Sequence, residues 1–364
     1  MYNYSEQIEA FRHDKVRLGG DLKQKLLDRR SANRNRLKTR LPERIEGLRI
    51  SDSSFFPQGS VAVQTIIQTK FKFEEYDIDD GLVLERDDLV DEDGNPLTSD
   101  QVREHVRKAL KDKRFVKQPK LVTNAVRVFY KEEDDDKRHH IDIPVYRRFK
   151  DEDGKIVREL ASQDDWVQSD PTQVNVWFNT RVSDLNKVVY GKGTQFRHLI
   201  QLLKRFCRSR DNWDMPSGMK LTMLVAECQP AYNERIDEAF RSLLEALGDR
   251  LDRSKIIRNL AHPDQPELTR SYSDSNVEEL ADKIEEALEQ LRELDDCDND
   301  NERAARKAWD WIFKSDGFFR DYDKEHRLSA KIDLINSGRA KTSAMGVICA
   351  SEGVANPLHR FYGE

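Results

Sequence analysis

A short acidic segment carries the residues of this sequence that are best suited to chemistry. The segment YDIDDGLVLE (76–85) has the alternation of a strand and places Asp77 and Asp79 two residues apart. Side chains alternate across a strand, so these two carboxylates share one face and Asp80 lies on the other. Two carboxylates on one face repel each other unless a positive group lies between them. Mg²⁺, which binds one or two carboxylates together with phosphates and water, is the simplest such group.

A third aspartate stands in a second strand-like segment, HHIDIPVY (139–146). The flanking isoleucines form an apolar face, and Asp142 projects from the opposite face beside His140. If the two segments share a sheet, Asp142 and the aspartate pair of the first segment can converge on one ion-binding cluster. The adjacent His139 and His140 point to opposite faces, so they cannot easily chelate one ion together.

Upstream, the segment PQGS (57–60) supplies a Gly–Ser turn. Glycine lets the backbone approach a ligand closely, and free N–H groups with the Ser60 hydroxyl can donate to phosphate oxygens. A Gly–Ser turn, a D-x-D strand and a lone Asp on a later strand, in this order, are the constellation of a nucleotidyltransferase. In such a site two metal ions bind the triphosphate and activate the attacking hydroxyl for in-line displacement. Each part alone has a plain structural explanation, and their combination in strand contexts favours catalysis.

The elements that must position these residues change in character along the chain. Up to about residue 185 the pattern is mixed α/β; beyond it the pattern is helical, with an aperiodic tail from 336. The first part predicts a helix over 4–40 that is broken near 18–20, and a second helix that Ser99 or Thr98 caps. It also predicts strands over 76–85, 121–130 and 139–147, of which the last two form an antiparallel pair. The pattern of 61–67 fits a helix or a strand. The second part predicts helices over 196–210, 219–228, 233–251, 276–294 and 301–313. A ligand is expected in the crevice between the two lobes.

Composition limits the classes of protein that fit. The 364 residues include 62 Lys and Arg against 68 Asp and Glu, a net charge of −6 that argues against a protein that coats nucleic acid. No apolar run approaches the roughly 18 residues that cross a bilayer. The N-terminus lacks the pattern of a signal peptide, so a cytoplasmic location is expected. The four dispersed cysteines predict reduced thiols, and the basic run 22–49 and the acidic run 295–300 are interpreted as solvated surfaces.

Taken in order, the motifs resemble those of the bacterial cGAS/DncV-like nucleotidyltransferases. The segments that carry the resemblance are PQGS (57–60), YDIDDG (76–81), HIDIPVY (140–146), LLKRF (202–206) and MPSGMKLTMLVAE (215–227). The similarity covers roughly residues 50–230 and is weaker over 230–335. The first 50 residues match only as the long N-terminal helix that such enzymes use as a spine between lobes.

The resemblance implies an α+β fold, with a polymerase-β-like nucleotidyltransferase core and a helical second lobe. The implied domains are the core with its spine helix over 1–185, the helical lobe that closes the nucleotide crevice over 186–335, and a tail over 336–364. The implied reaction is synthesis of a cyclic di- or trinucleotide, by default 3′,3′-cGAMP, from ATP and/or GTP with two Mg²⁺ ions and release of pyrophosphate. The implied setting is bacterial anti-phage (CBASS) signalling, in which the product reaches a downstream effector and an accessory protein binds the C-terminal tail. Neither a membrane nor nucleic acid is required.

The resemblance also implies roles for individual residues of the core. The residues that would hold the donor phosphates are Gln58, Gly59 and Ser60. Asp77 and Asp79 would bind both metal ions. Asp142 would bind the ion nearest the attacking ribose hydroxyl, and it is the best candidate to help remove the hydroxyl proton.

The helical lobe contributes three further candidates. A predicted helix carries a polar stripe opposite its apolar face, formed by Arg197, Gln201, Lys204 and Arg208. Solvation is the plain interpretation of Arg197 and Arg208, whereas the family implies that Lys204 reaches the triphosphate across the crevice. Ser217 resembles a family serine that contacts the nucleotide, and it also fits the N-cap of the helix that follows. Asp264 loosely matches a base-reading residue in a proline-punctuated loop.

Two alternatives stay open at this point. A related polymerase-β-like enzyme would transfer nucleotides linearly to RNA or to a protein hydroxyl. A catalytically inert relative would use the basic 22–49 helix to bind nucleic acid, with steep salt dependence and no turnover.

Overall fold

The computed structural model describes most of the chain. The described residues are 2–71, 76–130, 139–163, 165–189, 191, 193–269, 274–295 and 302–322, with the pairs 335–336, 341–342, 348–349 and 354–355. The loop 131–138, most of the acidic run from 296 and the tail segment 356–364, where an accessory protein is expected to bind, lie outside them. The chain forms two compact units, one of residues 8–288 and one of residues 1–7 with 289–364. The domain limits at 185 and 335 stay predictions.

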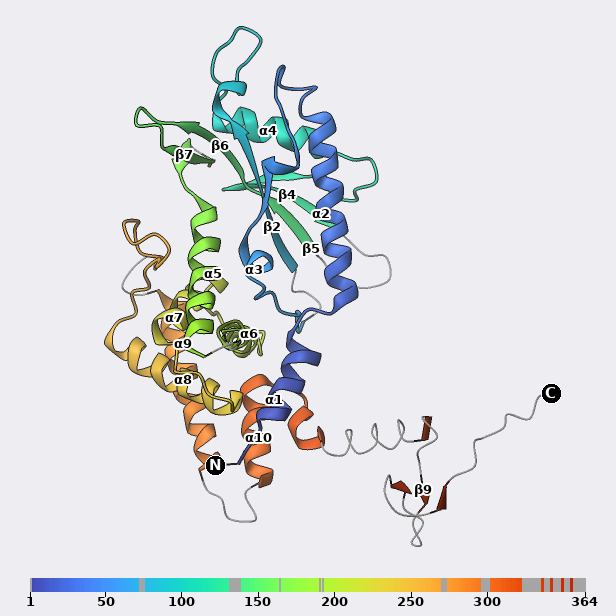
Figure 1. Cartoon of the computed structure of the whole chain (residues 1–364), viewed down its shortest axis with the longest axis vertical. Coiled ribbons are helices and arrows are strands. Elements are labelled where there is room, and N and C mark those ends of the chain that lie inside the picture. Colours follow the sequence, from blue (N-terminus) through green and yellow to red (C-terminus); the bar gives the residue numbers. More distant parts are fainter. Residues whose placement is uncertain are drawn as a thin grey trace, which may run out of the picture. The chain divides into compact units, whose positions relative to one another are not determined.

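A mixed sheet, with α2 and α4 beside it, forms one part of the larger unit (Figure 1). Its strands are β1 (Phe55–Pro57), β2 (Tyr76–Glu85), β3 (Lys120–Val122), β4 (Ala125–Tyr130), β5 (His139–Ile143), β6 (Val145–Lys150), β7 (Ile156–Ala161) and β8 (Trp166–Gln168). Their order is β3-β4-β5-β2-β6-β7-β8, with β1 paired to β2. β2 runs parallel to β5 and then to β6, and the other neighbours are antiparallel, including the predicted β4–β5 pair.

Two predicted strands are each divided into two. The segment 121–130 contains a turn at residues 123–124, so it forms β3 and β4, which pair with each other antiparallel. The segment 139–147 is divided at Pro144, which has no N–H to donate to a ladder. The Pro144 carbonyl still accepts a hydrogen bond from Leu82 N at 2.9 Å. At this point β2 changes its parallel neighbour, from β5 before Pro144 to β6 after it. The PQGS segment is likewise not only a turn, because Pro57 ends β1.

The helices of the larger unit confirm most of the predicted ones. They are α1 (Ser5–Phe11), which begins in the smaller unit, the π-helical turn η1 (Arg12–Val16), α2 (Gly20–Arg40), α3 (Gly59–Ala62), α4 (Ser99–Leu110), α5 (Pro171–Val188), α6 (Gln195–Cys207), α7 (Gly218–Cys228), α8 (Ile236–Arg253) and α9 (Ser275–Leu291), which ends in the smaller unit. Single 3-10 turns cover Asp52–Ser54, Arg86–Asp88 and Arg292–Leu294. Thr98 is the N-cap of α4, in a reciprocal pair with Gln101. Residues 61–67 are neither a full helix nor a strand, because α3 ends at Ala62 and Ile67 forms only an isolated bridge to Arg17.

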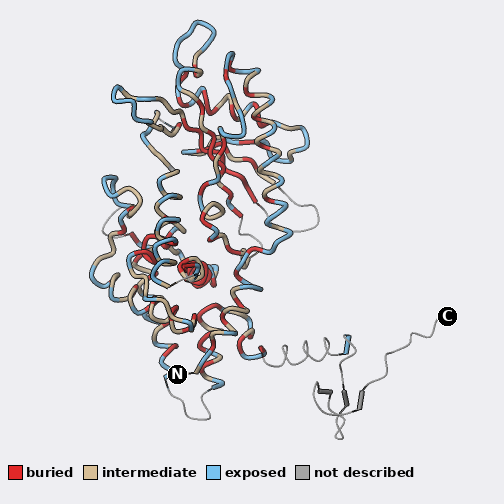
Figure 2. The backbone as a smooth tube through the Cα atoms, in the orientation of Figure 1, coloured by how far each residue is buried: buried red, intermediate tan, exposed pale blue. Residues whose placement is uncertain are grey.

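The core lies on the sheet face opposite the predicted aspartate cluster. Helix α4 packs against α2 and against β3, β4 and β7. Buried side chains of α2 and α4, such as Leu26, Leu37 and Val106, form one cluster with Ile78 and Ile141 of the sheet. Figure 2 shows the sheet and α6 as the most continuously buried segments. The apolar alternation of β2 therefore leaves the other face free for polar side chains.

The smaller unit is an aromatic cluster with a short sheet. Helix α10 (Glu302–Phe313) supplies Trp309 and Phe313, whose rings stack at 6.1 Å, and Phe319 packs against both. β9 (Lys341–Thr342) lies between β10 (Ile348–Cys349) and β11 (Val354–Ala355). Among the residues that the structure describes, no helix combines the length and apolar character that a membrane span requires.

Asp80 points away from the other two aspartates of β2 and stabilises the packing of α2 on the sheet. It is 2% exposed, and both its oxygens accept from the Arg34 guanidinium of α2, with Nε–Oδ2 at 2.7 Å. Asp80→Ala leaves this cation without its partner, so the free energy of unfolding should fall by about 3–5 kcal/mol. Urea denaturation measures the change. Asp52→Ala, which breaks an exposed pair with Lys38, is the control and should cost much less; an equal cost for both would contradict the assignment.

Candidate active site

The structure brings the three predicted aspartates together on one sheet face. In the parallel β2–β5 register Asp79 stands opposite Asp142, and Asp77 stands opposite His140. His140 Nε2 lies 3.2 Å from Asp77 Oδ1. Burial raises the pKa of Asp79 to about 7, and the charges of Asp77 and Asp142 add to the rise. A cation between these groups would relieve the repulsion that raises this pKa.

The donor atoms fit a divalent metal ion. Asp77, His140 and Asp142 each offer one ligand atom, and these atoms lie within 4.8 Å of one another. The carboxylates of Asp77, Asp79 and Asp142 suit Mg²⁺ or Mn²⁺, whereas the imidazole suits transition metals.

Asp142 is oriented by a residue that the sequence did not indicate. Arg127, its cross-strand neighbour on β4, donates from Nε to Oδ1 and from Nη2 to Oδ2, both at 2.7 Å. Asp142 is 8% exposed. Each carboxylate oxygen has a second lone pair, so this fork leaves capacity for another ligand.

A cavity of about 500 Å³ lies beside the cluster and has room for a nucleotide. Among its lining residues are the turn (Gln58, Gly59, Ser60), the pair Asp77 and Asp79, and Lys204 of α6. The Gln58 side chain is also buried against the Tyr146 hydroxyl, at 3.3 Å. The backbone N of Gln58 donates to Asp79 O at 3.1 Å, which fixes the turn against the strand that carries Asp77 and Asp79.

The candidates from the helical part lie at different depths. Lys204 is 6% exposed, and its Nζ donates to Thr65 O at 3.2 Å and to Thr65 Oγ1 at 3.1 Å. Burial lowers the pKa of Lys204 to about 7, and the charge of Arg208 adds to the decrease. Ser217 is the N-cap of α7, where its Oγ accepts from Lys220 N, and it lines a second cavity of about 320 Å³ that shares Lys204 with the first.

Two expectations for the helical part need correction. Asp264 is exposed and lies outside the lining of both cavities, whereas Asn259, His262 and Gln265 of the same loop line the larger one. Arg197 is not simply solvated, because its Nε donates to Val63 O at 3.0 Å.

The segment that carries this arrangement matches a known protein family. Residues 53–146, which contain the Gly–Ser turn and all three aspartates, match the family model of the cyclic GMP-AMP synthase DncV-like nucleotidyltransferase domain. The chain carries a DncV-like nucleotidyltransferase domain. It is therefore a nucleotidyltransferase, as its motifs predicted.

Solved structures share the fold of the DncV-like chain over most of its length. A crystal structure of the Vibrio cholerae DncV cyclic AMP-GMP synthase, a prokaryotic cGAS homologue, gives a TM-score of 0.67 at 17% identity, over 86% of this chain and 96% of that one. The apo form of DncV gives 0.66 at 18% identity, over 85% and 95%. The complex of DncV with nonhydrolysable GTP gives 0.66 at 16%, over 86% and 96%. These matches confirm the predicted α+β fold.

Within the nucleotidyltransferase domain, Gly59 combines a left-handed backbone conformation with a close approach to Asp79. Its φ is +61°, and a Cβ there would collide with the Asp79 carboxylate. Gly59→Ala should therefore displace both the turn and a metal-binding oxygen, and we expect turnover to fall by about 100-fold, the usual cost of an ~1 Å misplacement. Gly94→Ala, also at positive φ but with open space around its Cβ, is the control in steady-state assays. Activity within a few-fold of the wild type in Gly59→Ala would contradict the close approach.

Proposed function

We propose that this protein synthesises a cyclic oligonucleotide from ATP and/or GTP, with 3′,3′-cGAMP as the default product. One observation carries the proposal. The Asp77–Asp79 pair stands in register with Asp142 on a parallel strand, beside a cavity that also contains Gly59 and Ser60. The Vibrio cholerae DncV synthase, which shares the fold, has been crystallised with a linear intermediate, 5′ pppA(3′,5′)pG, which supports a stepwise route.

The residues divide the work of each transfer. Two Mg²⁺ ions, when bound by the carboxylates, would neutralise phosphate charge and activate the attacking hydroxyl. The turn and Ser60 bind donor phosphate oxygens, and Asp142, oriented by Arg127, accepts the proton of the ribose hydroxyl. The new P–O bond forms at the α-phosphorus as the bond to pyrophosphate breaks. A second transfer within the linear product closes the ring and releases a second pyrophosphate.

The proposed setting is anti-phage CBASS signalling in the cytoplasm. The cyclic product would act on a downstream effector, and an accessory protein would bind the C-terminal tail. The nucleic-acid alternative finds less support, because cations of the basic helix α2 bind within the protein. These pairs are Arg34 with Asp80, Arg36 with Asp112 and Lys38 with Asp52.

A direct assay tests the proposal. The purified protein is incubated with Mg²⁺ and each pairwise mixture of labelled nucleoside triphosphates, and products are treated with phosphatase and identified by mass spectrometry. A phosphatase-resistant cyclic product is expected. A ladder of phosphatase-sensitive oligomers, or label on RNA or protein, would show linear transfer instead, and no product in any mixture would contradict nucleotide transfer itself.

A further inference from the structure

The polar stripe of α6 binds residues 63–65, which follow the Gly–Ser turn (called the phosphate turn below because Gly59 and Ser60 are proposed to bind the donor phosphates). Three donors at i, i+4 and i+7 reach three consecutive backbone carbonyls, those of residues 63–65. The donors are Arg197 Nε at 3.0 Å, Gln201 Nε2 at 3.1 Å and Lys204 Nζ at 3.2 Å. The sequence predicts this stripe by its period, but its partners lie more than 130 residues away along the chain.

The segment that accepts these bonds is short and contains a residue in a strained backbone conformation. Helix α3 has only four residues, too few to be stable alone. Its carbonyls at residues 59–61 accept from the backbone N–H groups of residues 63–65, whereas the carbonyls of residues 63–65 lie beyond the end of the helix. Gln64, which is not glycine, has a φ of +61°, in the left-handed region. Thr65 is fully buried, and its N–H donates back to Ser60 O at 2.8 Å. Residues 63–65 are therefore held from both sides, by their own N–H bonds to the turn and by the donors of α6 on their carbonyls.

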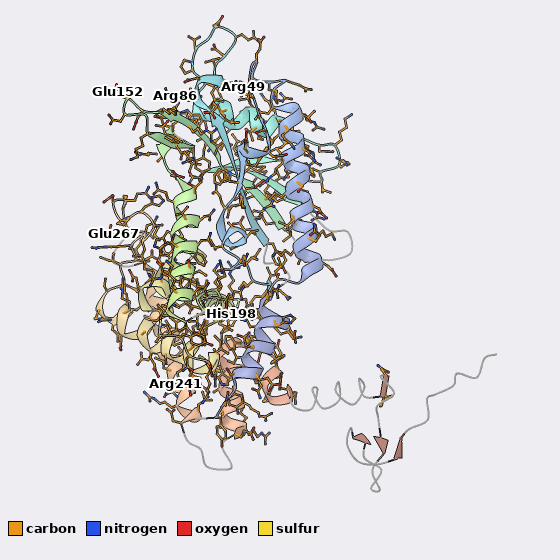
Figure 3. The ribbon with its side chains drawn as sticks, in the orientation of Figure 1. Arg49, Arg86, Glu152, His198, Arg241 and Glu267 are labelled. Atoms are coloured by element: carbon orange, nitrogen blue, oxygen red, sulfur yellow. The ribbon has the colours of Figure 1, made fainter. Side chains whose placement is uncertain are left out.

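Gln201 is the central contact of the three, and it is 6% exposed. Its Oε1 accepts from Arg12 Nη1 at 3.0 Å while its Nε2 donates to Gln64 O. A guanidinium can only donate, so this bond fixes which end of the amide faces the carbonyl. At the same face His198, labelled in Figure 3, lies 3.2 Å from Glu9 Oε1. The N-terminal segment thus holds α6 in the register at which its stripe meets the turn.

We propose that Gln201 and Arg197 are positioning residues, which fix the phosphate turn at Gly59 and Ser60 in the geometry that binds the donor triphosphate. The inference rests on the proposed function. It separates these two residues from Lys204, which lines the cavity itself. Apolar neighbours such as Leu199, Ile200 and Leu203 are fully buried and hold α6 in place, so losing one polar contact should loosen the turn and leave the helix packed.

Binding experiments distinguish positioning from general stability. Gln201→Leu removes both hydrogen bonds at similar volume, and we expect the Kd for a nonhydrolysable ATP or GTP analogue to rise about tenfold. The Kd for the matching nucleoside, which has no phosphates, should stay unchanged. A purely structural loss would reduce the active fraction in calorimetry and would leave the Kd of the remaining sites unaltered.

The chain offers a matched control. Gln195 is a glutamine of the same helix with two hydrogen bonds, from its Nε2 to Asn233 O at 2.6 Å and from Asn233 N to its Oε1 at 3.3 Å, both remote from the turn. Gln195→Leu should leave the Kd for the triphosphate analogue unchanged. Arg197→Met is the second test variant, and the same rise in the Kd for the triphosphate analogue is expected for it. It provides the test if Gln201→Leu does not fold.

A double-mutant cycle identifies the route of the effect. If Gln201 acts through the turn, Gln201→Leu should cost little further affinity in a Ser60→Ala background. Full additivity of the two substitutions, or wild-type Kd values in Gln201→Leu and Arg197→Met, would overturn the inference alone. If the wild type itself binds no triphosphate, the proposed function fails together with the inference. Failure of the positioning role is therefore distinguishable from failure of the proposed function.

Discussion

The double substitution Asp77→Asn/Asp79→Asn is expected to abolish nucleotide transfer while the protein stays folded. A bound metal ion contributes several kcal/mol of transition-state stabilisation, which corresponds to a loss of roughly 1,000-fold or more in kcat. Asparagine has the same shape as aspartate but carries no charge. Because burial and neighbouring charges raise the pKa of Asp79 to about 7, removing charge here should not destabilise the fold.

The measurement pairs turnover with thermal unfolding. Cyclic product is quantified by mass spectrometry, and the Tm should equal or exceed that of the wild type. Added Mg²⁺ should raise the Tm of the wild type and leave that of the variant unchanged, because only the wild type binds the ions. Asp87→Asn, at a side chain that is 87% exposed, controls for charge alone. Turnover within tenfold of the wild type in the double variant would show that these carboxylates do not carry the chemistry.

The sequence predicted those features of the candidate site that depend only on the local strand pattern. The alternation over 76–85 gave β2 with its observed limits, since a strand with one apolar face has only one register against a core. The same alternation placed Asp80 away from Asp77 and Asp79. The partner of Asp80, Arg34 of α2, could not be predicted, because helix-to-sheet packing leaves no periodic signal in either segment.

Long-range partners explain the other omissions. Arg127 meets Asp142 only through the β4–β5 register, which depends on a loop whose length does not fix pairing. The alternation of the strand did place His140 beside Asp142, but His140 was not predicted to bind the metal ion, and its contact is with Asp77 of the neighbouring strand. The polar stripe of α6 was recognised, but polarity alone cannot distinguish water from backbone carbonyls. Helix α5 was missed because its apolar stripe is weak, with Val176 and Val188 exposed.

Lys204→Met is expected to stabilise the protein without nucleotide, in a pH-dependent way. The ordinary lysine pKa of 10.5 falls to about 7 in the folded protein, chiefly through burial. Between these values the unfolded chain carries the proton and the folded protein does not, so the free energy of unfolding of the wild type rises with pH across pH 7–10.5. Below pH 7 both states are protonated, and the full penalty, at most on the order of 5 kcal/mol, opposes folding.

The variant lacks this titration, so its advantage over the wild type should be largest below pH 7 and should decrease toward pH 10. The lost hydrogen bonds to Thr65 reduce that advantage by an amount independent of pH, so the slope is the decisive quantity. Urea denaturation at pH 6, 8 and 9.5 measures it, with Lys187→Met, 74% exposed at the side chain, as the control. A pH-independent difference would show that Lys204 keeps its charge in the folded protein.

The same substitution should weaken binding of the donor triphosphate. A charged lysine that binds phosphate is worth roughly 10–100-fold in affinity, and Met offers no donor. Phosphate favours the protonated amine, so the wild-type Kd for a nonhydrolysable analogue should rise between pH 7 and 9 as binding must recruit a proton, while the Kd of Lys204→Met stays level. Calorimetry in buffers of different ionisation enthalpy would detect proton uptake by the wild type alone.

The greater stability and the weaker binding expected for Lys204→Met have one cause. The desolvation that lowers the pKa of Lys204 also strengthens its attraction for a phosphate that enters the cavity. If the variant bound the triphosphate as tightly as the wild type at pH 7, Lys204 would serve only to hold Thr65.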